Sequence, residues 1–147
     1  METNYKILIV DEEDEIRSVY SKFFTEHGFE VGTASDSSEG LKKLREEDFD
    51  LALIDLKIPE TGGISMIREM TEEGMDTDTV ILSRGGRKED VVRALNLRVG
   101  GWFEKNEIRA EELLGKVREL SEVMPLGDVR RILSAIPDKE FQIRNDR

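Results

Sequence analysis

The chain has 147 residues and a formal net charge of −11, a length typical of one domain that buries a full hydrophobic core. It contains no cysteine, which excludes disulfide bonds and thiolate metal sites, and no apolar run approaches the roughly 20 residues that span a bilayer. An acidic surface repels phosphate backbones, which argues against nucleic-acid binding, and residues 1–4 carry no secretion signal. We therefore expect a cytoplasmic protein without membrane contact.

Strand and helix patterns begin to alternate near the N-terminus. Tyr5 to Val10 is a β-rich apolar run that predicts a strand and stops at an acidic cluster beginning with Asp11. Gly28 ends the helix that follows. His27, the sole histidine, lies in its last turn, where a cation is favoured, so we interpret it as a helix-end residue and not as a ligand. The apolar face of this helix consists of Ile16, Val19, Tyr20, Phe23 and Phe24.

The next two strands flank a second helix. Phe29 to Ala34 predicts a strand, and Ser35 or Asp36 can cap the helix after it. Leu51 to Ile54 is too short for a helix and long enough for a buried strand. This strand ends in Asp55, after which a proline and two glycines turn the chain. The apolar positions of the helix between the strands include Leu41 and Leu44.

Two further strands and three helices complete the alternation. Thr79 to Leu82 predicts a fourth strand that ends in Ser83, and Trp102-Phe103 predicts a short fifth strand that leads to Lys105. Five strands alternating with five helices predict an α/β fold with a parallel sheet covered on both faces. The remaining helices are marked by Ile64, Ile67 and Met70, by Val91, Ala94 and Leu95, and by Leu113, Leu114, Val117 and Leu120.

The C-terminal segment differs from the acidic body. Residues 1–122 carry 17 Lys and Arg against 29 Asp and Glu, whereas residues 123–147 carry 5 against 4. Residues 126–136 predict a short amphipathic helix, which is too short to be stable alone and should lie against this domain, a second copy or a missing neighbour. We therefore divide the chain into a domain over residues 1–122 and a tail or linker over residues 123–147. The apolar stripe of the tail is Val129, Ile132, Leu133 and Ile136.

Acids, a hydroxyl and a lysine follow the predicted strands. Asp11 and Glu12 come after the first, Asp55 after the third, Ser83 after the fourth and Lys105 after the fifth. Parallel strands end at one edge of a sheet, so these side chains converge there. Three carboxylates close together need a cation, and oxygen ligands favour Mg²⁺. Taken singly, Asp55 can also satisfy a loop amide, Ser83 can be a loop hydroxyl and Lys105 a surface charge; as a set, they favour an aspartyl-phosphate site.

These motifs resemble those of receiver domains of two-component response regulators, over about residues 5–122. The resemblance implies a flavodoxin-like (βα)5 fold, a three-layer sandwich with a parallel five-stranded sheet in the order 2-1-3-4-5. The predicted C-terminal helix is an addition to that fold. The motifs are Ile7-Leu8-Ile9-Val10-Asp11-Glu12, Leu53-Ile54-Asp55-Leu56-Lys57-Ile58-Pro59 with Gly63, Val80-Ile81-Leu82-Ser83, and Gly101-Trp102-Phe103-Glu104-Lys105.

The resemblance also implies roles for the matching residues. Asp55 is the position that accepts a phosphoryl group from a phosphohistidine on a sensor histidine kinase or phosphotransfer protein. Asp11 and Glu12 match the acidic pair that holds Mg²⁺ together with Asp55, with Glu12 nearer the metal and Asp11 acting through water. The backbone carbonyl of Lys57 completes the metal ligands. Such a protein catalyses its own phosphorylation and slow dephosphorylation without being an enzyme in the ordinary sense.

The remaining matched positions form the switch. Lys105 matches the phosphate-binding lysine, Ser83 the switch hydroxyl and Trp102 the switch aromatic. Phosphoryl oxygens would draw Ser83 inward and let Trp102 turn, which alters the surface of the fourth helix, fifth strand and fifth helix. Trp102 can alternatively be a partly exposed residue that caps the sheet edge. The expected partners are the kinase, a downstream effector domain or protein, and a second copy that binds through this surface or through the tail.

Three residues depart from the usual pattern of the family. Glu12 is longer than the more frequent aspartate, Arg84 replaces a small residue, and Asn106 stands where a proline is common. They leave open a binding module of the same fold that works without phosphate. A third hypothesis, a phosphohydrolase, ranks low because the second acid expected two residues after the nucleophile is replaced by Lys57. The chain is either a stand-alone regulator or the receiver part of a longer one.

Overall fold

Five parallel strands form the centre of the molecule. The computed structural model describes residues 5–106 and 108–122, and in that part the strands lie in the order β2-β1-β3-β4-β5 with parallel pairing throughout. This confirms both the α/β class and the strand order that the resemblance implies. The strands are β1 (Lys6–Val10), β2 (Glu30–Ala34), β3 (Leu51–Asp55), β4 (Asp78–Ser83) and β5 (Gly101–Glu104).

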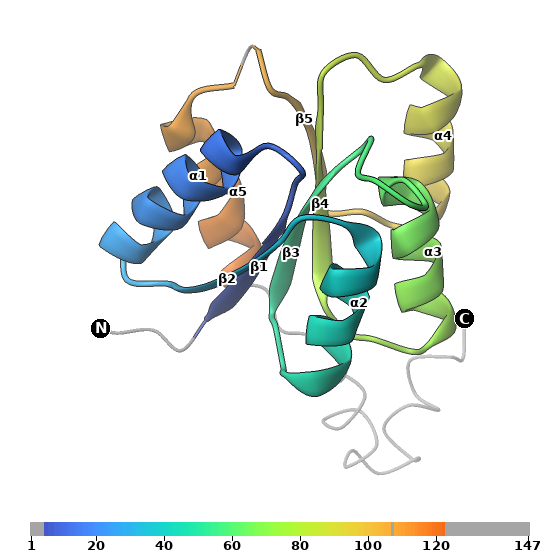
Figure 1. Cartoon of the computed structure of the whole chain (residues 1–147). Coiled ribbons are helices and arrows are strands. Elements are labelled where there is room, and N and C mark those ends of the chain that lie inside the picture. The colour runs from blue at the N-terminus through green and yellow to red at the C-terminus, as the bar shows by residue number, and fades with distance from the viewer. Residues whose placement is uncertain (1–4, 107, 123–147) are drawn as a thin grey trace, which may run out of the picture.

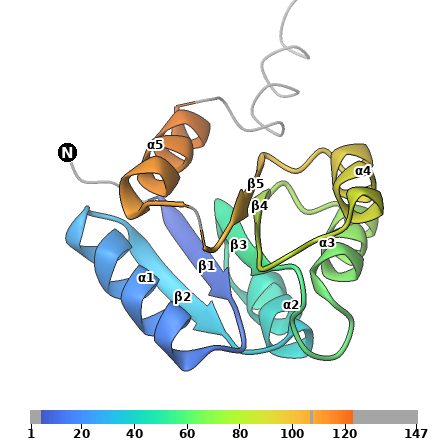
Figure 2. The same cartoon turned by 90° about the horizontal axis from the view of Figure 1, so that it is seen from above.

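Helices cover both faces of this sheet and complete the three-layer sandwich. Each strand is followed by one helix, as parallel crossovers require. α1 and α5 lie on one face of the sheet, and α2, α3 and α4 lie on the other (Figures 1 and 2). The helices are α1 (Asp14–Glu26), α2 (Ser37–Glu46), α3 (Gly63–Glu72), α4 (Lys88–Asn96) and α5 (Ala110–Ser121).

Alternation along the strands divides the core into two layers. In β1, Ile7 and Ile9 pack with the layer beneath α1 and α5, whereas Leu8 and Val10 pack with the layer beneath α2, α3 and α4. Every residue of β3 is buried, which explains why this strand reads as a continuous apolar run up to Asp55. The buried acid at its end is therefore held by packing on both sides of the sheet.

Helix boundaries follow the predicted signals. Asp36 caps α2, and its side chain accepts a hydrogen bond from the backbone N–H of Glu39 at 2.8 Å. His27 forms the C-terminal cap of α1, with Nδ1 2.8 Å from the carbonyl oxygen of Phe23. β5 is longer than predicted, because Gly101 and Glu104 also pair with β4.

Two predictions concern the C-terminal segment, and one finding concerns the described helices. The amphipathic helix predicted over residues 126–136 and the tail over residues 123–147 lie outside the described residues. Among the helices of the described part, none combines the length and apolar character needed to cross a membrane.

Candidate functional site

The strand-end residues singled out in the sequence gather at one edge of the sheet. Asp55 is the last residue of β3 and Ser83 the last of β4, while Asp11 and Lys105 directly follow β1 and β5. The loops that carry these residues lie at the same edge of the sheet (Figure 1). The convergence that a parallel sheet predicts is therefore present in the structure.

A buried lysine stands at the centre of this edge. The ammonium of Lys105 lies 2.7 Å from Asp11 Oδ2 and 3.3 Å from Asp55 Oδ1, and the lysine side chain is only 2% exposed. Burial opposes its charge, but the hydrogen bond and negative charge of Asp11 and the charge of Asp55 outweigh burial and raise the pKa of Lys105 above its ordinary value. Lys105 is therefore a cation that holds the two carboxylates together.

Asp55 is held in an environment that penalises its negative charge. Burial and, secondly, the charge of Asp11 raise the pKa of the Asp55 carboxyl, while Lys105 and the backbone N–H of Lys57 act in the opposite sense. Two buried carboxylates beside each other favour a further cation, and their oxygen atoms are the donors that Mg²⁺ prefers. The residues present thus fit a magnesium ion, although nowhere in the described residues do three acids or histidines already form a metal-binding group.

The members of the acidic cluster after β1 differ in burial. Asp11 is fully buried and Glu12 is exposed. Glu13, which the sequence did not single out, brings Oε2 to 3.2 Å from the Lys105 ammonium. The sequence signal was only a run of five acids, which does not show which members turn toward the sheet edge.

Arg84 and Asn106, two of the departures from the family pattern, contact each other. Arg84 places Nε 3.1 Å and Nη2 3.0 Å from the two carboxylate oxygens of Glu13, and Nη1 3.2 Å from Asn106 Oδ1. The hydrogen bond from Arg84 and the one from Lys105 lower the pKa of Glu13. These contacts connect the loops that follow β1, β4 and β5.

The predicted switch residues lie beside this arrangement. Ser83 is fully buried, and its Oγ accepts a hydrogen bond from the backbone N–H of Gly85 at 3.0 Å. Trp102 is partly buried against the core layer of α2, α3 and α4. Its indole N–H donates to Glu104 Oε2 at 2.7 Å, a contact that the sequence analysis did not anticipate.

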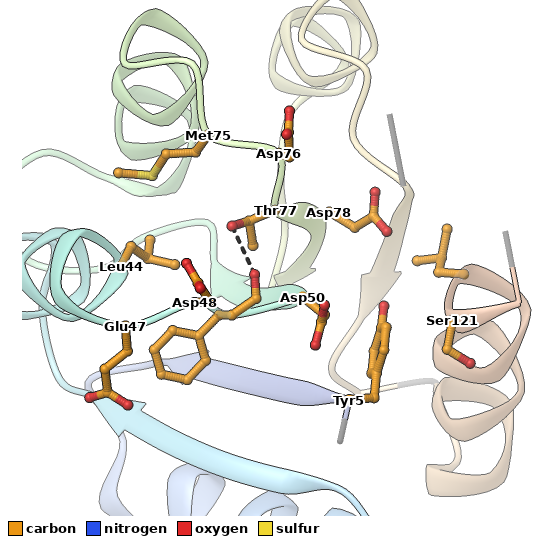
Figure 3. A pocket seen from close by; sticks show the side chains of 12 residues that line it. Tyr5, Leu44, Glu47, Asp48, Asp50, Met75, Asp76, Thr77, Asp78 and Ser121 are labelled. Carbon is orange, nitrogen blue, oxygen red and sulfur yellow. Dashed lines mark hydrogen bonds between the residues drawn. The ribbon is translucent and has the colours of Figure 1, made fainter. Parts of the chain in front are cut away.

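A cavity of about 510 Å³ lies at the opposite edge of the sheet (Figure 3). Tyr5, Asp50 and Asp78, which stand at the beginnings of β1, β3 and β4, contribute to its lining. Thr77 donates a hydrogen bond to the carbonyl oxygen of Phe49 within the same lining, at 3.1 Å. Because it surrounds the starts of the strands, this cavity is separate from the strand-end site.

The fold and the strand-end site define a flavodoxin-like domain in which acidic side chains surround a buried lysine. A sequence model of the response regulator receiver domain matches residues 7–118, and the chain belongs to that family. Among its relatives is the transcriptional regulatory protein DltR of Streptococcus agalactiae, 27% identical over 113 residues, which are 77% of this chain and 50% of DltR. The alkaline phosphatase synthesis transcriptional regulatory protein PhoP of Bacillus subtilis is 27% identical over 144 residues, covering 86% of this chain and 60% of PhoP. The chain thus spans about half the length of DltR.

Solved structures show the same likeness. A response regulator receiver domain protein (CheY-like) from Methanospirillum hungatei is 28% identical, with a TM-score of 0.77 over 82% of this chain and 96% of that chain. The response regulator protein TrrA of Thermotoga maritima, solved in complex with Mg(2+)-BeF, is 26% identical, with a TM-score of 0.71 over 79% of this chain and 98% of that chain. The resemblance read from the motifs is therefore confirmed at the level of the family.

Proposed function

We propose that this receiver domain accepts a phosphoryl group on Asp55 from the phosphohistidine of a sensor histidine kinase or phosphotransfer protein. The observation that carries the proposal is the placement of the Asp55 carboxylate 3.3 Å from the buried ammonium of Lys105, which also lies 2.7 Å from Asp11. Such a site combines a nucleophilic oxygen with a fixed positive charge at the point where phosphoryl oxygens would lie.

In this reaction a carboxylate oxygen of Asp55 forms a bond to phosphorus. The bond between phosphorus and the imidazole nitrogen of the donor breaks, and its electron pair returns to that nitrogen. Lys105 favours the ionised, nucleophilic form of Asp55 and balances negative charge on the transferred group, while the Ser83 hydroxyl donates to a phosphoryl oxygen. Water later hydrolyses the acyl phosphate, which releases inorganic phosphate and restores the carboxylate.

We propose that Mg²⁺ binds to Asp11, Glu12, Asp55 and the backbone carbonyl of Lys57. When bound, the ion supplies positive charge that neutralises the phosphoryl oxygens. The raised pKa of Asp55, caused by burial and the charge of Asp11, supports a further cation at this place. The complex of TrrA with Mg(2+)-BeF also supports this assignment.

The output of the phosphorylated domain is a change in association. We propose that Ser83 and Trp102 relay the change to the surface of α4, β5 and α5, where an effector or a second copy binds; α4 exposes Val92 and Leu95 there, at 51% and 65%. We further propose a receiver domain over residues 1–122, a tail or linker over residues 123–147 that offers a second surface for dimerisation, and a cytoplasmic location without direct nucleic-acid or membrane binding.

A module that binds partners without phosphate is the second candidate. It is favoured by the contacts of Arg84 with Glu13 and Asn106, which connect three loops across the site without any phosphoryl group. Intact mass after treatment with acetyl phosphate and Mg²⁺ separates the two. A single phosphoryl adduct that is absent in Asp55→Asn and on omission of Mg²⁺ supports phosphoacceptance, whereas an unmodified wild-type chain refutes it.

A further inference from the structure

One carboxylate joins β5 to the loop after β4. Glu104 Oε2 accepts the indole N–H of Trp102 at 2.7 Å, and Glu104 Oε1 accepts the backbone N–H of Gly85 at 3.2 Å. Each oxygen of the side chain is thus engaged by a donor from a different segment. Hydrogen bonds to an ionised acceptor are shorter and stronger than neutral ones, so this pair of contacts fixes the relative position of the two segments.

The sheet explains how these groups meet. Trp102 and Glu104 are two residues apart on β5, so their side chains stand on the same face of the strand. Glu104 is also the register partner of Ser83 on β4. The N–H of Gly85 reaches both Ser83 Oγ, at 3.0 Å, and Glu104, so hydrogen bonds run without interruption from the buried hydroxyl to the indole ring.

The indole ring also rests on the loop that this path crosses. A Cβ atom added at Gly86 would lie 2.4 Å from Trp102 Cζ2, so only a glycine leaves room for the ring in this position. Any displacement of the loop therefore acts on Trp102 in two ways, through packing on Gly86 and through the shared carboxylate of Glu104.

We propose that Glu104 is a positioning residue. Its hydrogen bonds to the Trp102 indole and to the Gly85 amide, together called the tie, couple the position of the Trp102 ring to the position of the loop after Ser83. When Ser83 moves toward a group on Asp55, the Gly85 N–H moves with its loop and draws the carboxylate, which in turn draws the indole N–H. The tie needs a hydrogen-bond donor on the ring at the switch position, which the indole of Trp102 supplies and a phenylalanine would lack. The trigger rests on the proposed phosphorylation of Asp55, whereas the tie itself is a property of the unmodified protein.

The tie is tested first in the unmodified protein. Trp102 is the only tryptophan, so its indole N–H gives one resolved signal in a ¹H–¹⁵N correlation spectrum. Glu104→Ala removes both acceptors, and Glu104→Gln keeps one acceptor oxygen in nearly the same volume. We expect the indole signal and the Gly85 amide signal to shift together in Glu104→Ala and at least one of them to shift in Glu104→Gln. Glu111→Gln, an exposed acid on α5, is the matched control and leaves both signals in place.

The coupling is tested by tryptophan fluorescence during addition of acetyl phosphate and Mg²⁺, with the phosphorylated fraction measured by intact mass. We expect the emission change per phosphorylated chain to fall below half of the wild-type value in Glu104→Ala, and to stay at the wild-type value in Glu111→Gln. Unshifted indole and Gly85 signals in Glu104→Ala, or an undiminished emission change at equal phosphorylation, overturn the proposal. A wild-type chain that takes no phosphoryl group refutes the proposed function instead, and the spectra of the unmodified variants still decide whether the tie exists.

Discussion

Replacing Lys105 with methionine tests the electrostatic argument for the site most directly. Methionine keeps a long apolar stem and removes the ammonium that lies 2.7 Å from Asp11 and 3.3 Å from Asp55. Both carboxylates are almost completely buried, so they lose their counter-charge without gaining water. Removing one partner of a buried ion pair costs about 3–5 kcal/mol, and the slight exposure of Asp55 leads us to expect about 3 kcal/mol at pH 7.

The pH dependence of this loss has a definite sign. The folded-state pKa of Asp55 is already raised by burial and by Asp11, and loss of Lys105 raises it further, because the lysine favours the ionised form. A carboxyl group whose pKa is higher in the folded than in the unfolded state binds a proton preferentially when folded, so stability rises as the pH falls toward that pKa. We therefore expect the difference between Lys105→Met and the wild type to be smaller at pH 5 than at pH 7.

Urea denaturation followed by circular dichroism at both pH values provides the measurement. Lys116→Met is the control, because the Lys116 ammonium lies 3.4 Å from Glu119 at the surface of α5, where an ion pair contributes at most about 0.5 kcal/mol. The reasoning is refuted if Lys105→Met costs no more than the control, or if its cost is the same at pH 5 and pH 7.

Three other substitutions test separate features. Arg84→Ala removes the guanidinium contacts across the site. We expect the aspartyl phosphate of this variant to lose its phosphoryl group severalfold faster than that of the wild type, as followed by intact mass over time. Arg87→Ala, the control with the same charge change in the same loop, should leave the rate unaltered. Gly86→Ala places a Cβ 2.4 Å from Trp102 Cζ2, so the tryptophan emission should change before any phosphodonor is added, and an unchanged spectrum contradicts the packing. Asp36→Ala removes the N-cap of α2 and should lower the free energy of unfolding by about 1 kcal/mol in urea.

The fold could be predicted from the sequence because the patterns that indicate its strands and helices are local. β1, β3 and β4 are largely apolar runs, and each helix repeats its apolar positions at helical spacing. The parallel arrangement follows from their alternation, and it alone places Asp55, Ser83 and Lys105 at one edge. The strand order came from the resemblance of the motifs, since alternation does not determine which strands are neighbours.

The details of the site were harder to predict from the sequence, because they depend on contacts between loops. Within the acids that follow β1, Glu12 is exposed and Glu13 reaches Lys105, a choice made by the backbone path into α1. The contact between Glu13 and Arg84 joins residues 71 positions apart, and no periodic pattern encodes such a pair. The hydrogen bond between Trp102 and Glu104 is close in sequence, but its meaning depends on the loop that approaches from β4.

Two of the departures from the family pattern, Arg84 and Asn106, are connected by a direct contact. Arg84 is longer than the usual small residue, and Asn106 replaces a proline; the guanidinium of Arg84 uses both the side chain of Asn106 and the carboxylate of Glu13. A proline at position 106 would offer no side-chain acceptor to Arg84, and a small residue at position 84 would leave the Glu13 carboxylate with Lys105 alone. Two changes that separately weaken the match thus form one connected group that joins the loops after β1, β4 and β5.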